Sequence, residues 1–297
     1  MKGGFILVNK NDDKSSNNLD NRVKRELGFN KVGHLGTLDP LAKGLMILMV
    51  DDATKCAKYF DDMDKVYEVR VRLGSTSLSL DYETELTDFM DVDLSGRETE
   101  VDDLLSSFLG DTLQIPPLYS AIKENGQKYY EIVRHNPDYE PKPREVSLYS
   151  IERISPIEYI DGNSYFTIRC HTSKGYYVRS LARDIGDAIN IPSMCASINR
   201  IKVGPFSLKN ASTVDEIIDG KYELINPLSY INIPSINVDK YTERKVLNGI
   251  GLDMSLFKGE PLYKIYSGNE LIAIYKRSIE KSLYVMDLLI KRWKCFI

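Results

Sequence analysis

Hydrophobic and polar positions alternate most regularly in the stretch KVYEVRVRLG, residues 65–74. Apolar side chains occupy every second position, at Tyr67, Val69, Val71 and Leu73. Charged side chains fill the positions between them. Since successive side chains of a strand point to opposite faces, this pattern predicts a strand with one buried face.

Other segments show either short apolar runs or helical spacing. The runs at 4–9, 45–50 and 164–170 predict further strands. Leu19, Val23 and Leu27 recur every four residues within 14–28, which predicts a helix that Gly28 ends. The stretch 177–189 has a similar apolar stripe. Shorter helices are expected at 53–60 and 101–110.

These elements mix without regular strand–helix–strand repetition, which predicts an α+β fold with a mainly antiparallel mixed sheet, flanking helices and loops. Residues 114–145 are rich in Pro, Tyr, Lys and Arg and are expected to form an insertion of loops. Two prolines mark a boundary within 227–238. The sequence therefore predicts a main domain over 1–232 and a small β domain over 238–297.

Composition narrows the class of protein. The apolar run GLMILMV is too short to span a bilayer, and the N-terminus lacks the apolar core of a signal peptide. The four cysteines and three histidines lack the spacing of metal ligands or of a disulfide framework. We therefore expect a reduced, cytoplasmic protein without metal.

Charge is distributed unevenly along the chain. The net charge is −4, yet residues 238–297 hold eleven Lys and Arg against seven Asp and Glu, so this segment carries +4 and the preceding residues −8. A basic tail on an acidic body permits RNA binding through a local patch, although charged runs are more often solvated faces.

The segment GHLGTLDPLAKG, residues 33–44, carries the candidate chemistry. Its three glycines permit sharp turns, and Pro40 disfavours helix at Asp39. From the residues alone, Asp39 either stabilises a turn or is presented as a reactive group. Arg179 similarly reads as a surface ion-pairing residue of its helix, and Tyr67 as a core tyrosine.

Five stretches resemble, in order, the motifs of the TruB-type tRNA pseudouridine synthases, which isomerise uridine 55 in the T arm of tRNA. They are KVGHLGTLDPLAKGLM, DKVYEVRVRLG, QIPPLYSAIKENGQKYYEIVR, SKGYYVRSLARDIG and INRIKVGPF, and they lie between residues 31 and 206. The tail resembles, more faintly, the RNA-binding PUA domain of these enzymes. The resemblance implies an enzyme that needs no cofactor and no obligate protein partner, works as a monomer and does not bind membranes.

The resemblance also implies roles for particular residues. Asp39 falls on the family nucleophile, Tyr67 on the tyrosine that packs on the target base, and Arg179 on the charge partner that keeps Asp39 ionised. Further positions are implied to contact the substrate. They are His34, Tyr177, Ile198, Lys31, Lys123 and Tyr130. His34 is expected to fill the gap left by the flipped nucleotide, although a histidine beside glycine is more often a hydrogen-bonding loop residue.

The chain departs from the family pattern at Asn11, Leu35, Lys43, Leu78 and Asn199. These departures leave open a noncatalytic RNA-binding protein on the same scaffold. A guide-RNA-dependent pseudouridylase and a carboxylate hydrolase are further alternatives, but no second acidic residue is placed as the acid–base partner of a hydrolase. Asp39 could attack C1′, add at C6 or remove a sugar proton, and the sequence does not choose among these routes.

Overall fold

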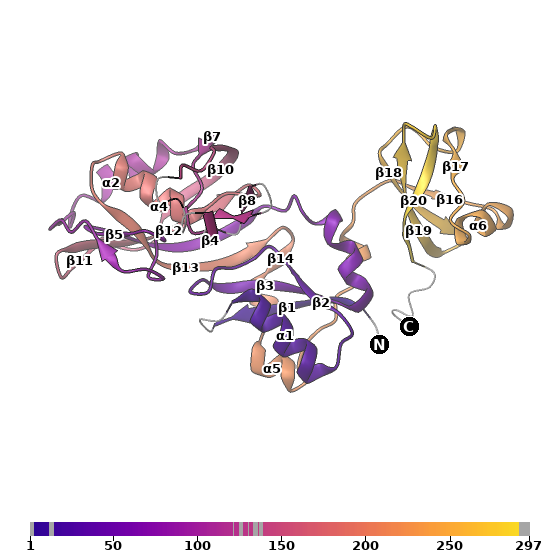
Figure 1. The fold of residues 1–297 in the computed structure, drawn as a ribbon, viewed down its shortest axis with the longest axis horizontal. Coiled ribbons are helices and arrows are strands. Elements are labelled where there is room, and N and C mark those ends of the chain that lie inside the picture. The colour runs from indigo at the N-terminus through magenta and orange to yellow at the C-terminus, as the bar shows by residue number, and fades with distance from the viewer. Residues whose placement is uncertain are drawn as a thin grey trace.

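The computed structural model describes residues 3–290 except 12–14, 121, 125–126, 130, 133–135 and 137–138. A larger lobe is built around an eleven-stranded mixed sheet, and a smaller lobe follows it in the chain (Figure 1). The helices of the larger lobe are α1 (Ser16–Leu27), α2 (Glu98–Ser106), α4 (Val178–Asp187) and α5 (Val214–Ile218), with the 3-10 helix η1 (Asp51–Tyr59).

The central strands of the larger sheet run in the order β15-β1-β3-β13-β4-β12-β10-β7, which differs from their order in the chain. Their bounds are β1 (Gly4–Lys10), β3 (Lys43–Val50), β4 (Lys65–Leu73), β7 (Gly110–Gln114), β10 (Arg144–Arg153), β12 (Asn163–Thr172), β13 (Ser193–Val203) and β15 (Ser212–Thr213). Three strands attach beside this path, namely β2 (Val32–Leu35), β11 (Glu158–Ile160) and β14 (Phe206–Ser207).

β13 lies between β3 and β4 and joins the two halves of the sheet. It pairs antiparallel with β4 and parallel with β3. The parallel contact needs Gly44, because a Cβ there would lie 2.3 Å from the carbonyl oxygen of Arg200. Gly44 also has φ 102°, a backbone conformation that side-chain-bearing residues rarely adopt.

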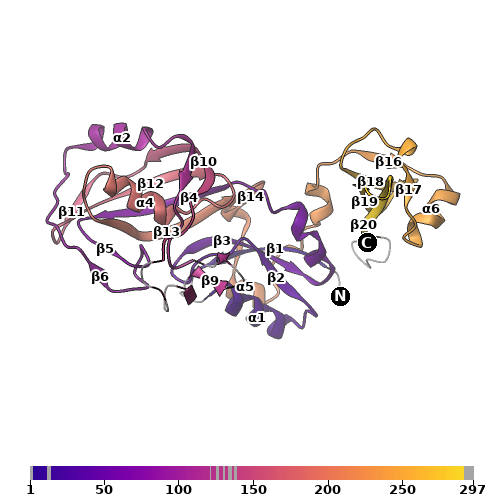
Figure 2. The same cartoon turned by 45° about the horizontal axis from the view of Figure 1, so that its top comes forward.

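Helices cover one face of this sheet. α2 and α4 lie against the half that holds β10 and β12, and α1 and α5 lie against the half that holds β1 and β3 (Figure 2). A second cluster of buried residues fills the other face of β1 and β3 and includes η1. None of the helices in the described part of the chain is long and apolar enough to cross a membrane.

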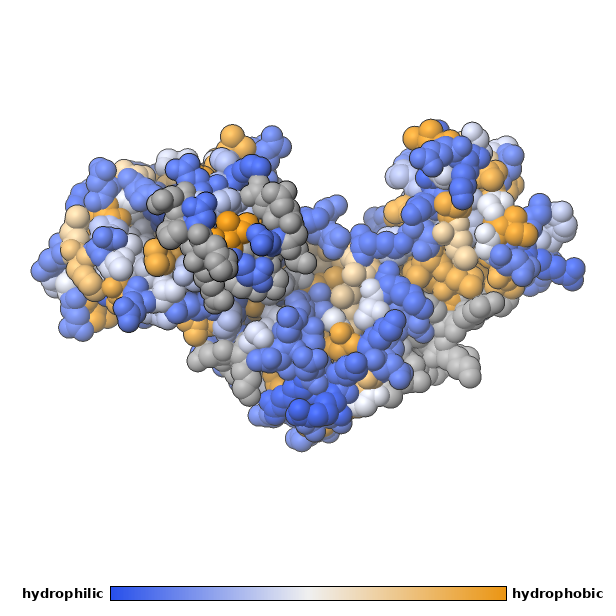
Figure 3. Space-filling model, in the orientation of Figure 1, coloured by the Kyte–Doolittle hydropathy of each residue, from blue (hydrophilic) through white to orange (hydrophobic). Residues whose placement is uncertain are grey.

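The smaller lobe has its own five-stranded sheet, in the order β16-β18-β19-β20-β17. Its elements are β16 (Ser235–Asn237), α6 (Lys240–Leu247), β17 (Leu252–Asp253), β18 (Leu262–Ser267), β19 (Glu270–Ser278) and β20 (Leu283–Leu289). Hydrophobic residues visible in Figure 3 gather where this lobe meets the larger one. There Ile274 and Leu288 join the apolar cluster that contains Phe5. The division into domains at 232 and 238 stays a prediction.

Several predicted elements match and others need correction. α1 begins at the Ser15 cap and ends at Gly28, as its capping residues indicate. The helix expected at 101–110 instead ends at Ser106, and Gly110 begins β7 because its φ of 104° turns the chain back into the sheet. His34 and Leu35 lie on strand β2 rather than in the expected loop, because they pair with β3.

The predicted insertion over 114–145 is also only partly loop. It contains a short hairpin of β8 (Lys123–Glu124) and β9 (Gln127–Lys128), which pair antiparallel. A further short pair, β5 (Thr76–Ser77) with β6 (Leu86–Thr87), lies between β4 and α2 in the chain. β10 begins at Arg144, so the last two residues of the predicted insertion belong to the central sheet.

Candidate active site

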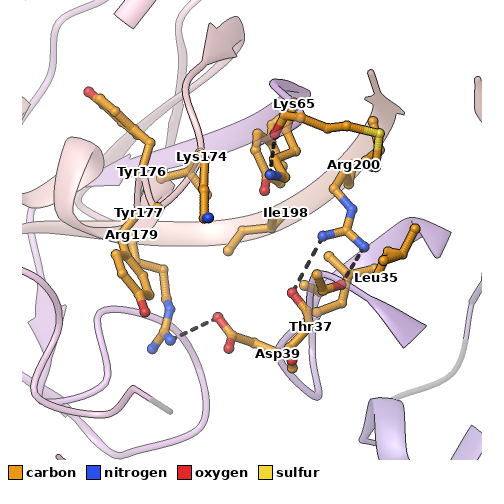
Figure 4. A pocket seen from close by; sticks show the side chains of 18 of the residues that line it. Leu35, Thr37, Asp39, Lys65, Lys174, Tyr176, Tyr177, Arg179, Ile198 and Arg200 are labelled. Atoms are coloured by element: carbon orange, nitrogen blue, oxygen red, sulfur yellow. Dashed lines mark hydrogen bonds and ion pairs between the residues drawn. The ribbon is translucent and has the colours of Figure 1, made fainter. Parts of the chain in front are cut away.

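The segment that joins β2 to β3 carries Asp39 into a pocket of about 410 Å³ (Figure 4). The pocket walls come from β4, β13, the start of α4 and this segment, which lie far apart in the sequence. Five of the residues predicted for the site line it together, namely Asp39, Tyr67, Tyr177, Arg179 and Ile198.

Asp39 and Arg179 form an ion pair inside this pocket. Asp39 Oδ2 lies 2.8 Å from a terminal guanidinium nitrogen of Arg179, and the two side chains are 35% and 2% exposed. Arg179 is the second residue of α4 and is buried, so its interpretation as a surface residue is wrong. The carboxylate therefore remains open to the pocket while the guanidinium is enclosed by protein.

The guanidinium of Arg179 is fixed by more than one partner. It donates to the carbonyl oxygens of Ser79 at 2.6 Å and Tyr119 at 2.9 Å. The buried carboxylate of Asp81 lies 3.4 Å from it. Because a buried cation needs both charge and hydrogen-bond partners, these contacts hold the guanidinium in place beside Asp39.

Opposing effects act on the acidity of Asp39. Burial raises the pKa of the Asp39 carboxyl above its ordinary value, and the charge of Asp81 raises it further. Arg179 acts in the opposite direction through its charge and its hydrogen bond. Arg179 is therefore the main group that favours the ionised form of this carboxyl.

The backbone of the Asp39 segment is anchored from both sides. Lys10, which is buried, donates from Nζ to the carbonyl oxygens of Pro40 at 2.6 Å and Ala42 at 2.8 Å. Ser16, at the start of α1, both donates to and accepts from the backbone of Leu38. The position of the Asp39 carboxyl is thus set by β1 and α1.

Arg200 anchors the same segment from β13. This buried side chain donates to the carbonyl oxygens of Leu45 at 2.8 Å and Gly36 at 2.9 Å. Burial raises the pKa of Tyr67, although the nearby guanidinium of Arg200 acts to lower it. Tyr67 is therefore a buried tyrosine that lines the pocket beside Arg200.

Comparison with known proteins agrees with this geometry. The model of the TruB family pseudouridylate synthase N-terminal domain matches residues 24–178. The tRNA pseudouridine synthase B of Halalkalibacterium halodurans is 34% identical over 95% of each chain. That of Staphylococcus aureus strain MRSA252 is 32% identical over 93% of this chain and 94% of its own. This chain belongs to the TruB family.

Solved structures show the same fold. The chain in the crystal structure of a Cbf5-Nop10-Gar1 complex superimposes with a TM-score of 0.67 at 20% identity, covering 99% of this chain and 87% of that one. The Nop10-Cbf5 complex of an archaeal box H/ACA sRNP gives the same TM-score. The predicted α+β fold with a mixed sheet and a small β lobe at the C-terminus is confirmed.

The TruB pocket also has a basic wall that the sequence did not indicate. Lys65, at the start of β4, and Lys174 line the pocket together with Arg200. Burial, together with the nearby charges of Arg200 and Lys174, lowers the pKa of Lys65 to about 8. This wall faces the same space as Asp39 and is suited to hold an anion beside it.

The remaining predicted contact residues lie in different surroundings. Ile198 is buried in the pocket wall, and Tyr177 precedes α4, where its backbone NH and carbonyl both bond the side chain of Gln114. His34 bonds Asp20 and Thr37. Lys31 is exposed but does not line the pocket.

Two predicted residues are not tested by the structure. Tyr130 lies outside the described residues, and of Lys123 only the backbone, in β8, is described. Within the described residues, no three His, Cys, Asp or Glu side chains gather as a possible metal site.

The sequence analysis did not assign four residues that build the site. One of them, Asp81, contacts Arg179, and two others, Lys10 and Arg200, bond the backbone of the Asp39 segment. The fourth, Lys65, lines the same pocket. Lys65 and Arg200 stand inside the motifs already quoted, so their positions in those motifs were the available signal, whereas Asp81 lies outside them. Lys10 precedes Asn11, which departs from the family pattern, and its buried amine carries no signal in the sequence.

Proposed function

We propose that this chain converts uridine 55 in the T arm of tRNA to pseudouridine, with Asp39 as the nucleophile. The observation that carries the proposal is the ion pair between Asp39 and buried Arg179 inside a pocket that Tyr67 also lines. The relatives named tRNA pseudouridine synthase B, which match nearly the whole chain, support the same activity.

The reaction breaks the N1–C1′ bond and joins C5 of the same base to C1′, while the C5 proton is lost and N1 gains one. Asp39 acts as an ionised carboxylate and Arg179 keeps it so. Attack at C1′, addition at C6 and removal of a sugar proton all begin from this carboxylate. Tyr67 stacks on the base, since an aromatic face holds a flipped base with about 1–3 kcal/mol.

The uridine must leave its stacked position before Asp39 can reach it. We assign the emptied place in the RNA to His34, and the pocket around the base to Tyr177 and Ile198. Lys31, Lys123 and Tyr130 are assigned to the RNA outside the pocket. The basic wall of Lys65, Lys174 and Arg200 supports a phosphate of the flipped nucleotide being held there.

Release of tritium from 5-tritiated uridine in a T-arm hairpin tests the activity. The wild-type protein is expected to release the label. Asp39→Asn is expected to lower the rate at least about 1,000-fold while the Kd for the hairpin changes less than about threefold, because the shape of the residue is kept and only its charge is lost. Binding without release by the wild type would instead favour the noncatalytic alternative, which no feature of the described site supports.

The protein is further proposed to act as a monomer, without a guide RNA or protein partner, in the cytoplasm where tRNA is found. Residues 238–297 are assigned as a PUA-like RNA-binding domain. Activity of the pure protein on an unmodified tRNA transcript tests the absence of partners, and its mass in solution tests the monomer. A requirement for a second protein would support the guide-dependent alternative.

Phosphate contacts give the proposed binding a characteristic salt dependence. Because each neutralised phosphate releases counterions, the Kd for tRNA is expected to rise steeply with salt, by about 10-fold or more between 50 and 200 mM. Titration at several salt concentrations measures this slope. A Kd that does not change with salt would contradict binding through phosphate.

A further inference from the structure

A buried carboxylate on α1, that of Asp20, has no role in the reaction described above. Asp20 lies on the inward face of the helix, one turn after Ser16, and is 9% exposed. Its Oδ1 is buried and has no hydrogen-bond partner within the described residues. Burying a carboxylate is costly when its oxygens are not all paired, so packing alone does not account for this residue.

The other oxygen of Asp20 makes one short contact. Oδ2 lies 2.7 Å from Nδ1 of His34, and the two side chains are 12% and 13% exposed. An ionised carboxylate only accepts hydrogen bonds, so Nδ1 of His34 must carry the proton in this contact. The ring of His34 is therefore fixed both in orientation and in the identity of its protonated nitrogen.

The effect of this contact extends to the rim of the pocket. Nε2 of His34 lies 3.2 Å from the hydroxyl of Thr37. When His34 is neutral and protonated at Nδ1, Nε2 can only accept, so the Thr37 hydroxyl donates to it. Thr37 lines the pocket two residues before Asp39, and its hydroxyl oxygen then keeps its lone pairs free to accept a hydrogen bond.

We propose that Asp20 is a positioning residue that holds His34 in its Nδ1-protonated form and, through it, fixes the hydroxyl of Thr37 at the rim of the pocket. The group presented to RNA is a hydrogen-bond acceptor, which suits a ribose hydroxyl or a base N–H. Only the identity of this ligand rests on the proposed function, because the contacts among the three side chains are independent of it.

The first test measures which ring nitrogen of His34 carries the proton. Long-range ¹H–¹⁵N spectra of labelled protein without RNA identify the protonated ring nitrogen. His34→Ala assigns the signals among the three histidines. We expect His34 to be protonated at Nδ1, and this signature to be lost in Asp20→Ala but kept in the control Asn21→Ala, an exposed neighbour on the same helix.

The second test separates positioning from a structural effect. Asp20→Ala is expected to raise KM for tRNA about tenfold, as loss of an ordered polar contact does, with kcat changed less than about twofold. In the His34→Ala background the same substitution is expected to have no further effect, since its action passes through the ring. A merely structural role would lower activity equally in both backgrounds.

A wild-type spectrum with His34 protonated at Nε2 would overturn the proposal, and this reading needs no variant to fold. Equal effects of Asp20→Ala in the two backgrounds would overturn it as well. If the protein released no tritium at all, the proposed function would fail, yet the ring spectra would still decide the role of Asp20.

Discussion

At the scale of single residues, the site depends on a carboxyl group whose ionised form is disfavoured by burial. Burial raises the pKa of Asp39, and Arg179 opposes this effect at a distance of 2.8 Å. Lys65 shows the same conflict with the opposite sign, because burial favours its neutral form. We therefore expect the ionisation of Asp39 to affect the pH dependence of the rate, and that of Lys65 to affect the pH dependence of RNA binding.

Replacement of Arg179 should change the acid side of the pH profile. Asp39 acts when ionised, so the rate falls as pH falls through its raised pKa. Arg179→Lys replaces the planar guanidinium by a point charge and is expected to move this limb to higher pH and lower the single-turnover rate at least about tenfold. Single-turnover rates of the variant and the wild type between about pH 5 and pH 8 measure the shift of the acid limb and the loss of rate.

Arg183→Lys is the matched control, because Arg183 lies one turn further along α4 and pairs with Asp184 rather than Asp39. An acid limb that stays in place in Arg179→Lys would show that Arg179 does not govern the ionisation of Asp39.

Lys65 should give a basic limb in RNA binding. Since its pKa is about 8, the side chain is cationic below this pH and loses its charge as pH rises through it. The Kd for the T-arm hairpin is therefore expected to rise between about pH 7 and pH 9, and Lys65→Met to remove most of this rise.

The comparison variant for Lys65 is Lys174→Met. The neighbouring ion pair with Asp62 raises the pKa of Lys174, so Lys174 stays charged over this range and Lys174→Met should weaken binding but keep the basic limb. The limb is expected to move to higher pH, because the charge of Lys174 no longer lowers the pKa of Lys65. The same pH dependence in Lys65→Met and the wild type would contradict a role for Lys65 in holding phosphate.

At the scale of elements, the close approach of β3 to β13 brings Arg200 to the Asp39 segment. Gly44 permits this approach through its missing Cβ and its positive φ. The stability of the sheet and the geometry of the site therefore depend on one position of β3.

Gly44→Ala is expected to lower the free energy of unfolding by about 3 kcal/mol or more, because the new Cβ meets backbone that cannot move aside. Gly28→Ala supplies the control. Gly28 also has a positive φ, 67°, but no atom lies within 4 Å of an added Cβ, so only the conformational cost of about 1 kcal/mol is expected. Denaturant unfolding measures the free energy of unfolding of both variants. Equal decreases in the two would show that the approach of β3 to β13 does not require a missing Cβ at residue 44.

Local signals in the sequence predicted individual helices and strands better than they predicted which strands pair in the sheet. The caps Ser15 and Gly28 set the ends of α1, and the alternation from Tyr67 onward identified β4. The insertion of β13 between β3 and β4 joins residues about 150 positions apart and leaves no periodic pattern. For the same reason Asp39 and Arg179 could be assigned only through the family motifs, and Lys10 and Arg200 could not be assigned a role.

At the scale of the whole molecule, one aspartate of the smaller lobe forms polar contacts with the larger lobe. Asp287 on β20 forms an ion pair with Lys58 at 2.5 Å and accepts a hydrogen bond from Tyr59 at 2.6 Å, both from η1. Lys276 on β19 lies 3.1 Å away. Burial acts to raise the pKa of Asp287, but these three partners hold it below its ordinary value.

Asp287→Ala should weaken the junction of the lobes. Loss of these charged hydrogen bonds is expected to lower the free energy of unfolding by about 2 kcal/mol. Glu280→Ala, at the exposed tip of the β19–β20 hairpin, should have no measurable effect. Thermal melting and limited proteolysis between the lobes test this, and a melting curve of Asp287→Ala unchanged from wild type would contradict it.

The junction should also depend on pH. Because the pKa of Asp287 is lowered in the folded protein, its contribution is present above the ordinary pKa and is lost as pH falls through the lowered value. Acid melting curves of the wild type are expected to lose this contribution, whereas those of Asp287→Ala have none to lose.

The position of β13 in the sheet determines when the pocket can form during synthesis on the ribosome. Asp39 and Tyr67 are synthesised early, but Arg179 and the strand that fills the gap between β3 and β4 follow more than 100 residues later. Until residue 179 has been made, Asp39 lacks its guanidinium partner, and until residue 203 has been made the two halves of the sheet have no strand between them. We therefore expect a shorter nascent chain to lack the proposed activity toward the tRNAs that surround it, because its pocket is incomplete.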